Sequence, residues 1–314
     1  MTKPALPLVT IAVPSYNHAP YIAECVASLI AQDYPRIELI VIDDGSRDGS
    51  AAVVEGLTEQ CRARFERFEL IARENQGLCN TLNQALDWAQ GEYFVTADSD
   101  DRLLPAHVSR LLPELEQAPQ LAAVYGGAML INAAGKRYGE LAPVQRDYRF
   151  ADILNRDKAM ISSGGLLRTA ALRAVGGYRA DLYIEDWYMM LKLTEGGAML
   201  RTLPDPVVEY RIHTTNISAN NAPMLQARLQ ILDLYRDHPG HAWRVALVQV
   251  EIALSTWRRS RGAALGLLIK ALRSDVRIAV HPLFLGAVAR LLLPTALIDW
   301  LIRRGGKSIR PGSA

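Results

Sequence analysis

Two apolar runs in this chain each end in clustered carboxylates and lead directly into a helix start. They are VIDDGSRDGS, residues 41–50, and FVTADSDDRLLP, residues 94–105. In an open α/β sheet, ligands bind in the crevice outside the carboxyl ends of the strands, so both clusters are expected to face one site. Two acidic strand ends at one crevice indicate metal-assisted handling of a phosphorylated ligand.

The segments around these runs alternate between strand patterns and helix patterns. Strands are expected at residues 8–13, 37–42, 68–72, 93–97 and 121–125, and helices at residues 21–31, 48–62, 78–88 and 105–116. Strands that alternate with helices predict an α/β fold, with a mostly parallel, Rossmann-like sheet built from right-handed βαβ units and flanked by helices.

The pattern changes after Gly126. A hairpin turn is expected within residues 132–139, and short strands at 161–167 and 207–212 are expected to flank a helix at 184–194. From Met224 onward the chain is expected to be helical only. The polar, turn-forming SANNAP segment marks the boundary, so we divide the chain into a catalytic domain of residues 1–220 and a helical region of residues 221–314.

Composition limits the class of protein. The chain has 314 residues, 50% of them apolar, which is enough for a sizeable core. Its three cysteines are odd in number and form no CxxC pair, so neither a disulfide framework nor a zinc site is expected. Pro4, Pro7 and Pro14 interrupt the first apolar stretch, which therefore does not resemble a signal peptide. We expect a cytoplasmic protein with no nucleic-acid partner.

Charge is divided unevenly along the chain. The net charge is +2, but residues 257–314 contain 11 Lys or Arg against two Asp, so the tail is basic and the body acidic. The apolar runs of the tail are broken by Pro282, Arg290 and Pro294, and none approaches the roughly 20 residues that span a bilayer. This pattern favours helices at the inner face of the cytoplasmic membrane, on an anionic surface. A helical bundle that packs on the catalytic domain or forms a homo-oligomer interface is the alternative.

Three blocks of the chain resemble family 2 glycosyltransferases, enzymes of the GT-A fold that use nucleotide-sugars. Residues 10–50, from TIAVPSYN to RDGS, are similar to the opening of the family, and residues 75–105 are similar to the block that ends in its metal-binding DxD motif. GGYRADLYIEDWYMMLKL, residues 176–193, resembles the acceptor-side ED motif. The resemblance covers about residues 8–218. It implies a metal-dependent, inverting transfer to a glycan or lipid-linked acceptor, in bacterial surface-polysaccharide biosynthesis.

The resemblance also implies roles for individual residues. Donor contacts are expected from Pro14, Tyr16, Asp44, Arg73, Asn75, Gly77, Asn83 and Asp98. Asp100 is expected to hold Mn²⁺ or Mg²⁺ with help from His213, and Asp186 is expected to be the catalytic base. Gly165, Glu185 and Trp187 are expected on the acceptor side. Leu82 stands where the family commonly has an Arg, and Arg73 is the candidate to replace that cationic contact.

General chemistry supports these roles and leaves alternatives open. Carboxylates suit Mg²⁺ and Mn²⁺, and a cation can neutralise the charge that develops on a diphosphate leaving group. An acceptor hydroxyl needs a base for its proton. The DSDD run could instead be a strand-end turn with a helix cap, the Glu185–Asp186 pair a simple helix start, and His213 a structural histidine. A sugar-nucleotide nucleotidyltransferase and a non-catalytic nucleotide-sugar binding module are the alternative functions.

Overall fold

The computed structural model describes residues 6–155, 163–214, 216, 221–298 and 300. It divides into two compact units. The first unit comprises residues 1–181 and 185–212, and the second comprises residues 182–184 and 213–314. The predicted boundary after residue 220 adjoins residues 217–220, which lie outside the described part.

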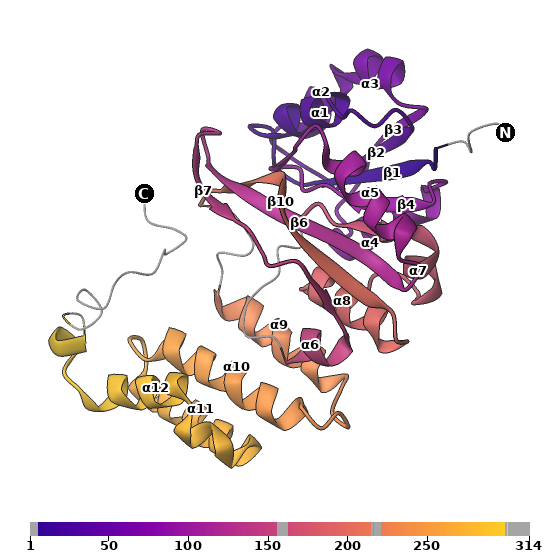
Figure 1. The fold of residues 1–314 in the computed structure, drawn as a ribbon. Helices are drawn as coiled ribbons and strands as arrows, with labels where there is room; N and C mark the ends of the chain where they lie inside the picture. Colours follow the sequence, from indigo (N-terminus) through magenta and orange to yellow (C-terminus); the bar gives the residue numbers. More distant parts are fainter. Residues whose placement is uncertain (1–5, 156–162, 215, 217–220, 299, 301–314) are drawn as a thin grey trace. The chain divides into compact units, whose positions relative to one another are not determined.

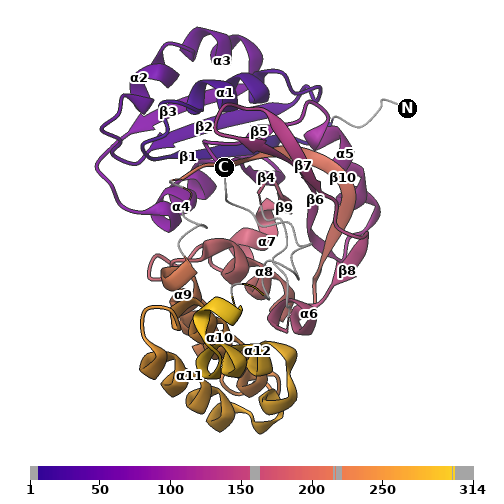
Figure 2. The same cartoon turned by 90° about the vertical axis from the view of Figure 1, so that its left-hand side faces the viewer.

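Figures 1 and 2 show the elements of both units in two views at right angles. The strands are β1 (Val9–Ser15), β2 (Ile37–Asp43), β3 (Arg67–Ala72), β4 (Tyr93–Thr96), β5 (Arg102–Leu103), β6 (Leu121–Asn132), β7 (Arg137–Leu141), β8 (Arg146–Tyr148), β9 (Leu166–Arg168) and β10 (Met199–Ile212). The helices of the first unit are α1 (Ile22–Ile30), α2 (Ser50–Glu55), α3 (Thr58–Arg64), α4 (Leu78–Trp88), α5 (His107–Gln117), α6 (Phe150–Leu154), α7 (Thr169–Ala174) and α8 (Glu185–Glu195). The second unit contains α9 (Asn221–Asp233), α10 (His241–Thr256), α11 (Arg261–Ser274), the 3-10 helix η2 (Val276–Val280) and α12 (Pro282–Leu292).

The ten strands form one sheet in the order β3-β2-β1-β4-β9-β6-β10-β5, with β7 beside β6 and β8 beside β10. The four N-terminal strands β1 to β4 are parallel, as are β6 and β10, while β5, β7, β8 and β9 run antiparallel to their neighbours. This confirms the predicted α/β class. Strand β1 lies between β2 and β4, and the three strands are parallel, so the loops that follow them leave the same edge of the sheet.

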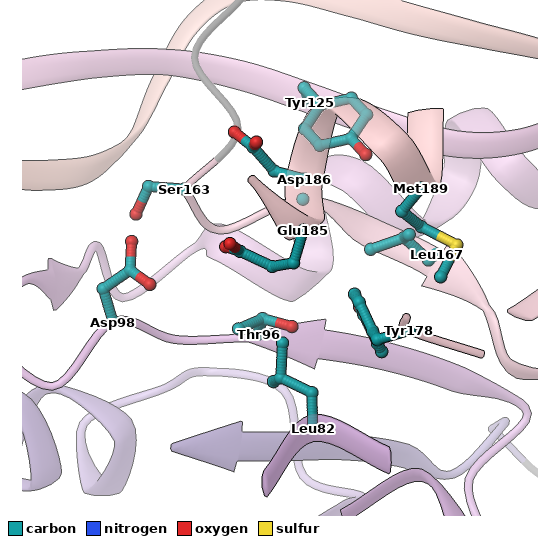
Figure 3. A pocket seen from close by; sticks show the side chains of 11 residues that line it. Leu82, Thr96, Asp98, Tyr125, Ser163, Leu167, Tyr178, Glu185, Asp186 and Met189 are labelled. Carbon is teal, nitrogen blue, oxygen red and sulfur yellow. The ribbon is translucent and has the colours of Figure 1, made fainter. Parts of the chain in front are cut away.

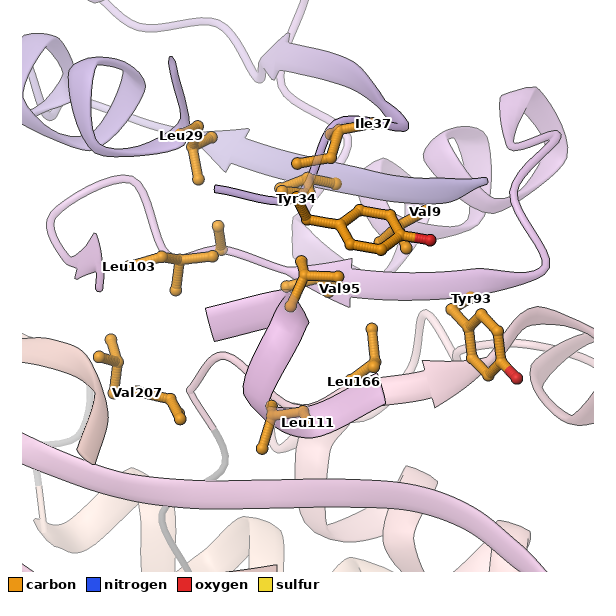
Figure 4. Packing of buried hydrophobic residues seen from close by; sticks show 14 of the residues in the cluster. Val9, Leu29, Tyr34, Ile37, Tyr93, Val95, Leu103, Leu111, Leu166 and Val207 are labelled. Carbon is orange, nitrogen blue, oxygen red and sulfur yellow. The ribbon is translucent and has the colours of Figure 1, made fainter. Parts of the chain in front are cut away.

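The core of the first unit forms because apolar side chains of the sheet meet apolar faces of the helices. Strand β2 is buried along its whole length, as expected for a parallel strand that is covered on both faces. Figure 4 shows Leu29 of α1 and Leu111 of α5 among side chains of β1, β2 and β4, all in one cluster of buried residues. Helices α1 and α5 therefore pack an apolar face against the sheet.

The elements differ from the predicted ones at a few places. The helix predicted over residues 48–62 is two helices, α2 and α3, which are separated at Gly56 and Leu57. Glycine is less favourable than most residues in a helix interior, and Gly56 explains the break. Strand β10 begins at Met199 rather than at residue 207, because it pairs in parallel with the long strand β6. Of the strand predicted over residues 161–167, residues 161 and 162 lie outside the described part, and β9 begins at Leu166.

The second unit is helical, as predicted from Met224 onward. Its core is formed by α10, α11 and α12, where Leu247 and Val250 belong to the same buried cluster as Leu268 and Phe284. Among the residues that the structure describes, no helix combines the length and the hydropathy needed to cross a membrane.

Candidate functional site

The carboxyl ends of β1, β2 and β4 carry the polar residues that the sequence singled out. Ser15 at the end of β1 is in register with Asp43 at the end of β2. The backbone N–H of Asp44 donates to the carbonyl of Ser15 at 2.8 Å, which ties the two strand ends together. Asp98 follows β4 by two residues. The predicted crevice at this edge therefore gathers both acidic runs.

Asp44 organises the loop before α4. Its Oδ1 accepts from the backbone N–H of Gln76 at 2.8 Å and from the guanidinium of Arg73, and its Oδ2 accepts from the N–H of Gly77 at 2.8 Å. Asn75 Nδ2 donates to the carbonyl of Asp44, also at 2.8 Å. Four predicted donor residues are thus brought together at one place, with the nearly buried Asp44 carboxylate at the centre.

Arg73 is held firmly in this loop. Besides its ion pair with Asp44, its Nε donates to Gln84 Oε1 at 2.9 Å and its Nη2 donates to Thr81 Oγ1 at 2.8 Å. Both acceptors belong to α4. The guanidinium therefore lies against the helix face of Thr81 and Gln84, whereas Leu82 lines the cavity described below, and the role of Arg73 as a replacement cation stays a prediction.

Pro14 and Tyr16 lie at the end of β1. Pro14 is half-buried within the strand, whereas the Tyr16 side chain is 51% exposed. The next residue, Asn17, has a positive φ of 55°, and its Oδ1 accepts from the N–H of Arg47 at 2.9 Å. The loop after β1 is therefore anchored to the loop after β2, while the Tyr16 side chain lies at the surface.

Arg211 holds the Asp98–Asp101 segment in place through hydrogen bonds. Its buried guanidinium donates from Nε to the carbonyl of Asp100 at 2.7 Å and pairs with Glu24 at 2.6 Å. Its backbone N–H donates to Asp101 Oδ1 at 2.7 Å, and Ser163 Oγ donates to Asp101 Oδ2 at 2.7 Å. Asp101 is thus a structural acceptor. Asp98 and Asp100 remain the candidates of this run for contact with a ligand.

A cavity lies where this segment approaches the start of α8. Figure 3 shows the Asp98 carboxylate pointing toward Ser163 and Glu185, with Asp186 beside Glu185. The lining residues are Leu82, Thr96, Asp98, Tyr125, Ser163, Gly165, Leu167, Tyr178, Glu185, Asp186 and Met189. Acidic groups from two distant parts of the chain therefore meet in one cavity that has an apolar floor.

Burial, together with neighbouring carboxylates, raises the pKa of two carboxyl groups in this cavity. Burial, with a further contribution from Asp100, raises the pKa of Asp98 to about 7. Burial, with a further contribution from Asp186, raises the pKa of Glu185 to about 8. Such crowding of anions is unfavourable in a site without a counter-charge. A divalent cation or another positive group nearby would relieve it.

Gly165 lines the same cavity, and Gly164 precedes it in the chain. A Cβ on Gly165 would come within 2.3 Å of the Tyr125 ring, so the aromatic ring occupies the place of a side chain. Gly164 has a φ of +68°, and its carbonyl accepts from Nε2 of buried His107 at 2.5 Å. Gly165 therefore lies against the Tyr125 ring, and its expected place on the acceptor side stays a prediction.

One imidazole of the first unit lies close to Asp100. The possible ligand atoms of His18 and Asp100 lie within 4.8 Å of each other, and His18 Nδ1 is hydrogen-bonded to Ser99 Oγ at 2.7 Å. His213 is the first residue after β10 and opens the second unit, and its backbone N–H donates to Asn216 Oδ1. Carboxylate and imidazole ligands together are compatible with Mn²⁺.

Three further residues lie apart from the donor loop. Asn83 Nδ2 donates to the carbonyl of Tyr178 at 2.7 Å, and Asn83 Oδ1 accepts from the backbone N–H of Tyr178 at 2.8 Å. Asn83 is not among the residues that line the cavity. Trp187 Nε1 donates to the carbonyl of Ile153 and so joins α8 to α6. Asp181 is exposed and paired with Arg179.

Some residues of the site were not expected from the sequence. Ser163, Tyr125 and Tyr178 line the cavity, and Arg211 positions the acidic segment. Arg211 carried a signal that we did not use, because an arginine inside a strand pattern calls for a buried acidic or carbonyl partner. His18 follows the first strand in a polar loop, which is a usual place for a ligand-binding residue.

Known proteins resemble this chain in sequence and in fold. The family model described as glycosyl transferase family 2 matches residues 10–175. An uncharacterized glycosyltransferase of Haemophilus influenzae is 28% identical over 229 residues, which cover 68% of each chain. A chondroitin synthase of Escherichia coli is 32% identical over 201 residues, which cover 62% of this chain but only 28% of the relative.

A solved structure shares the fold over nearly the whole chain. A mannosyltransferase of Pyrobaculum calidifontis, in complex with GDP-Man and Mn²⁺, has a TM-score of 0.61 and 22% identity, covering 96% of this chain and 85% of the other. At that identity the likeness shows the fold alone. The family model covers more than half of the chain, and the chain therefore belongs to glycosyl transferase family 2, as a glycosyltransferase of the GT-A fold.

Proposed function

We propose that this glycosyltransferase moves a sugar from a nucleotide-sugar donor to a hydroxyl of a glycan or lipid-linked acceptor, with inversion and with Mn²⁺ or Mg²⁺. The observation that carries the proposal is the meeting of two acidic segments in one cavity, Asp98 after β4 and Glu185 with Asp186 at the start of α8. A relative named chondroitin synthase supports a setting in cell-surface polysaccharide assembly. The mannosyltransferase structure with GDP-Man and Mn²⁺ supports the donor class and the cation.

In this proposal the donor lies along the carboxyl edge of the sheet. Asp44 accepts from the nucleotide base, Tyr16 packs on the base, and Asp98 contacts the ribose. Asp100 and His213 would hold the cation, and His18, which lies close to Asp100, is a further candidate ligand. A bound cation supplies a Lewis acid that neutralises the charge on the departing diphosphate. The diphosphate is expected next to the loop before α4, which Arg73 holds in place through its hydrogen bonds.

Asp186 is proposed as the base of a single-displacement reaction. It takes the proton of the acceptor hydroxyl while that oxygen attacks the anomeric carbon, and the bond from that carbon to the diphosphate oxygen breaks on the opposite face. The start of α8 favours an ionised carboxylate through the helix dipole. Glu185, with its raised pKa of about 8, suits a hydrogen bond to the sugar in its protonated form.

The test is transfer by the full chain from a panel of nucleotide-sugars to glycan and glycolipid acceptors, with Mn²⁺ or with EDTA. Transfer should require the cation, and Asp100→Ala should abolish both transfer and the Mn²⁺-dependent part of nucleotide binding while the protein remains folded. Full activity in EDTA would contradict the metal proposal. Binding of nucleotide-sugars without transfer or hydrolysis would favour a binding module, while the family match argues against a nucleotidyltransferase.

A further inference from the structure

The helical second unit presents an apolar stripe to solvent along α11. Leu265 is 52% exposed, Ile269 42% and Leu272 36%. These residues are spaced by four and three positions, so they lie within roughly 60° of one another around the helix. The neighbouring face of the same helix, with Ala264 and Leu268, packs into the unit's core. The stripe is therefore separate from the surface that stabilises the unit.

Exposed apolar side chains continue beyond α11. Val276 and Val280, at the two ends of η2, are 73% and 80% exposed. In α12, Leu285 and Leu292 are also exposed and are separated by seven residues, which places them on one face of that helix. Three consecutive elements of one unit thus carry apolar groups that the described chain does not cover, more than the isolated exposed leucine of an ordinary surface.

Positive charge surrounds these apolar groups. Residues 257–298 contain a single carboxylate, Asp275, which pairs with Arg277 at 2.6 Å. The same range contains seven basic residues, Arg258, Arg259, Arg261, Lys270, Arg273, Arg277 and Arg290. Lys270 and Arg273 are exposed and follow Ile269 and Leu272 directly in α11, so they border the stripe. The surface that the stripe belongs to is apolar at its centre and cationic at its edge.

We infer that the α11–η2–α12 surface docks on an anionic lipid membrane, with the apolar groups at the level of the upper acyl chains and the basic groups among the head groups. Interfacial helices have this composition, and long basic side chains extend toward phosphate groups while their stems cover apolar surface. A lipid surface offers negative charge and an apolar layer together.

A second copy of the chain is a poorer partner for this surface. A two-fold contact would place the same patch on both sides, and with seven basic residues against one acidic residue it would oppose like charges. The inference is also independent of the transfer reaction. It concerns residues of the second unit that take no part in the proposed catalytic machinery.

The test is co-sedimentation of the full chain with phosphatidylglycerol vesicles and with phosphatidylcholine vesicles at low and high salt. Binding is expected on the anionic vesicles only, and it should weaken as salt screens the attraction. Lys270→Glu with Arg273→Glu should lower partitioning about tenfold or more. Leu265→Asn with Ile269→Asn should also lower it, without a loss of melting temperature, because both side chains are exposed.

Matched controls are available on the first unit. Arg62→Glu with Lys136→Glu changes the charge by the same amount at exposed sites, and should bind vesicles as the unsubstituted chain does, as should Val144→Asn. Equal losses in these controls would overturn the inference, as would equal binding to both vesicle types. A dimer in light scattering that Leu265→Asn with Ile269→Asn converts to a monomer would assign the surface to a second copy. Inactive Asp186→Asn should still bind vesicles, which separates this inference from the transfer proposal.

Discussion

Replacing Asp98 with asparagine is expected to stabilise the metal-free protein. Burial and the neighbouring Asp100 raise the pKa of Asp98 from 3.8 to about 7. A carboxyl with a raised pKa in the folded state contributes stability that is complete below pH of about 4 and is lost as the pH rises through about 7. At pH 8.5 the ionised Asp98 therefore destabilises the fold, by about 4 kcal/mol as an upper bound from the three-unit shift.

The measurement is urea unfolding in EDTA across this pH range. Asp98→Asn should exceed the unsubstituted protein in free energy of unfolding by several kcal/mol at pH 8.5, and the gain should shrink toward zero near pH 4. Saturating Mn²⁺ should raise the stability of the unsubstituted protein and reduce the difference, because a cation relieves the repulsion. Asp181→Asn is the control, since Asp181 is exposed and paired with Arg179. Equal or lower stability of Asp98→Asn at pH 8.5 would refute the reasoning.

Two further predictions concern the donor site. Arg73→Met removes hydrogen bonds to Asp44, Gln84 and Thr81, so it should lower the free energy of unfolding by about 3 kcal/mol and weaken donor binding about tenfold in calorimetric titration; unchanged donor affinity would leave Arg73 a purely structural role. His213→Ala should weaken binding of the nucleoside diphosphate with Mn²⁺ but hardly change metal-free nucleoside binding. A lower melting temperature with unchanged affinity would remove His213 from the site.

The sequence predicted the parts of the fold that depend on local pattern. Strand β2 and helix α1 are recognisable because one is apolar throughout and the other has a clear apolar face. The long strand β10 was recognised only in its second half, because its N-terminal half depends on pairing with β6, which lies 78 residues away along the chain at Leu121 and Met199. Long-range pairing leaves little trace in local periodicity.

The candidate site was predictable in the same uneven way. Asp44 and Asp98 belong to compact carboxylate runs at strand ends, which by themselves indicate a ligand site, whereas Asp186 was singled out only through the family resemblance. Arg211 was not predicted, because its partners Asp100 and Glu24 are distant in sequence. Tyr125 was not predicted either, since its role depends on the missing Cβ of Gly165.

The central claim is that Asp186 is the base of a metal-dependent sugar transfer. Asp186→Asn keeps the shape of the side chain and removes the proton acceptor, and Asp181→Asn is the matched change at the nearby exposed carboxylate. Single-turnover transfer with the cognate donor and Mn²⁺ should slow by on the order of 10² or more for Asp186→Asn, with donor affinity unchanged, and should be nearly normal for Asp181→Asn. Full transfer by Asp186→Asn, or a greater loss in Asp181→Asn, would contradict the account.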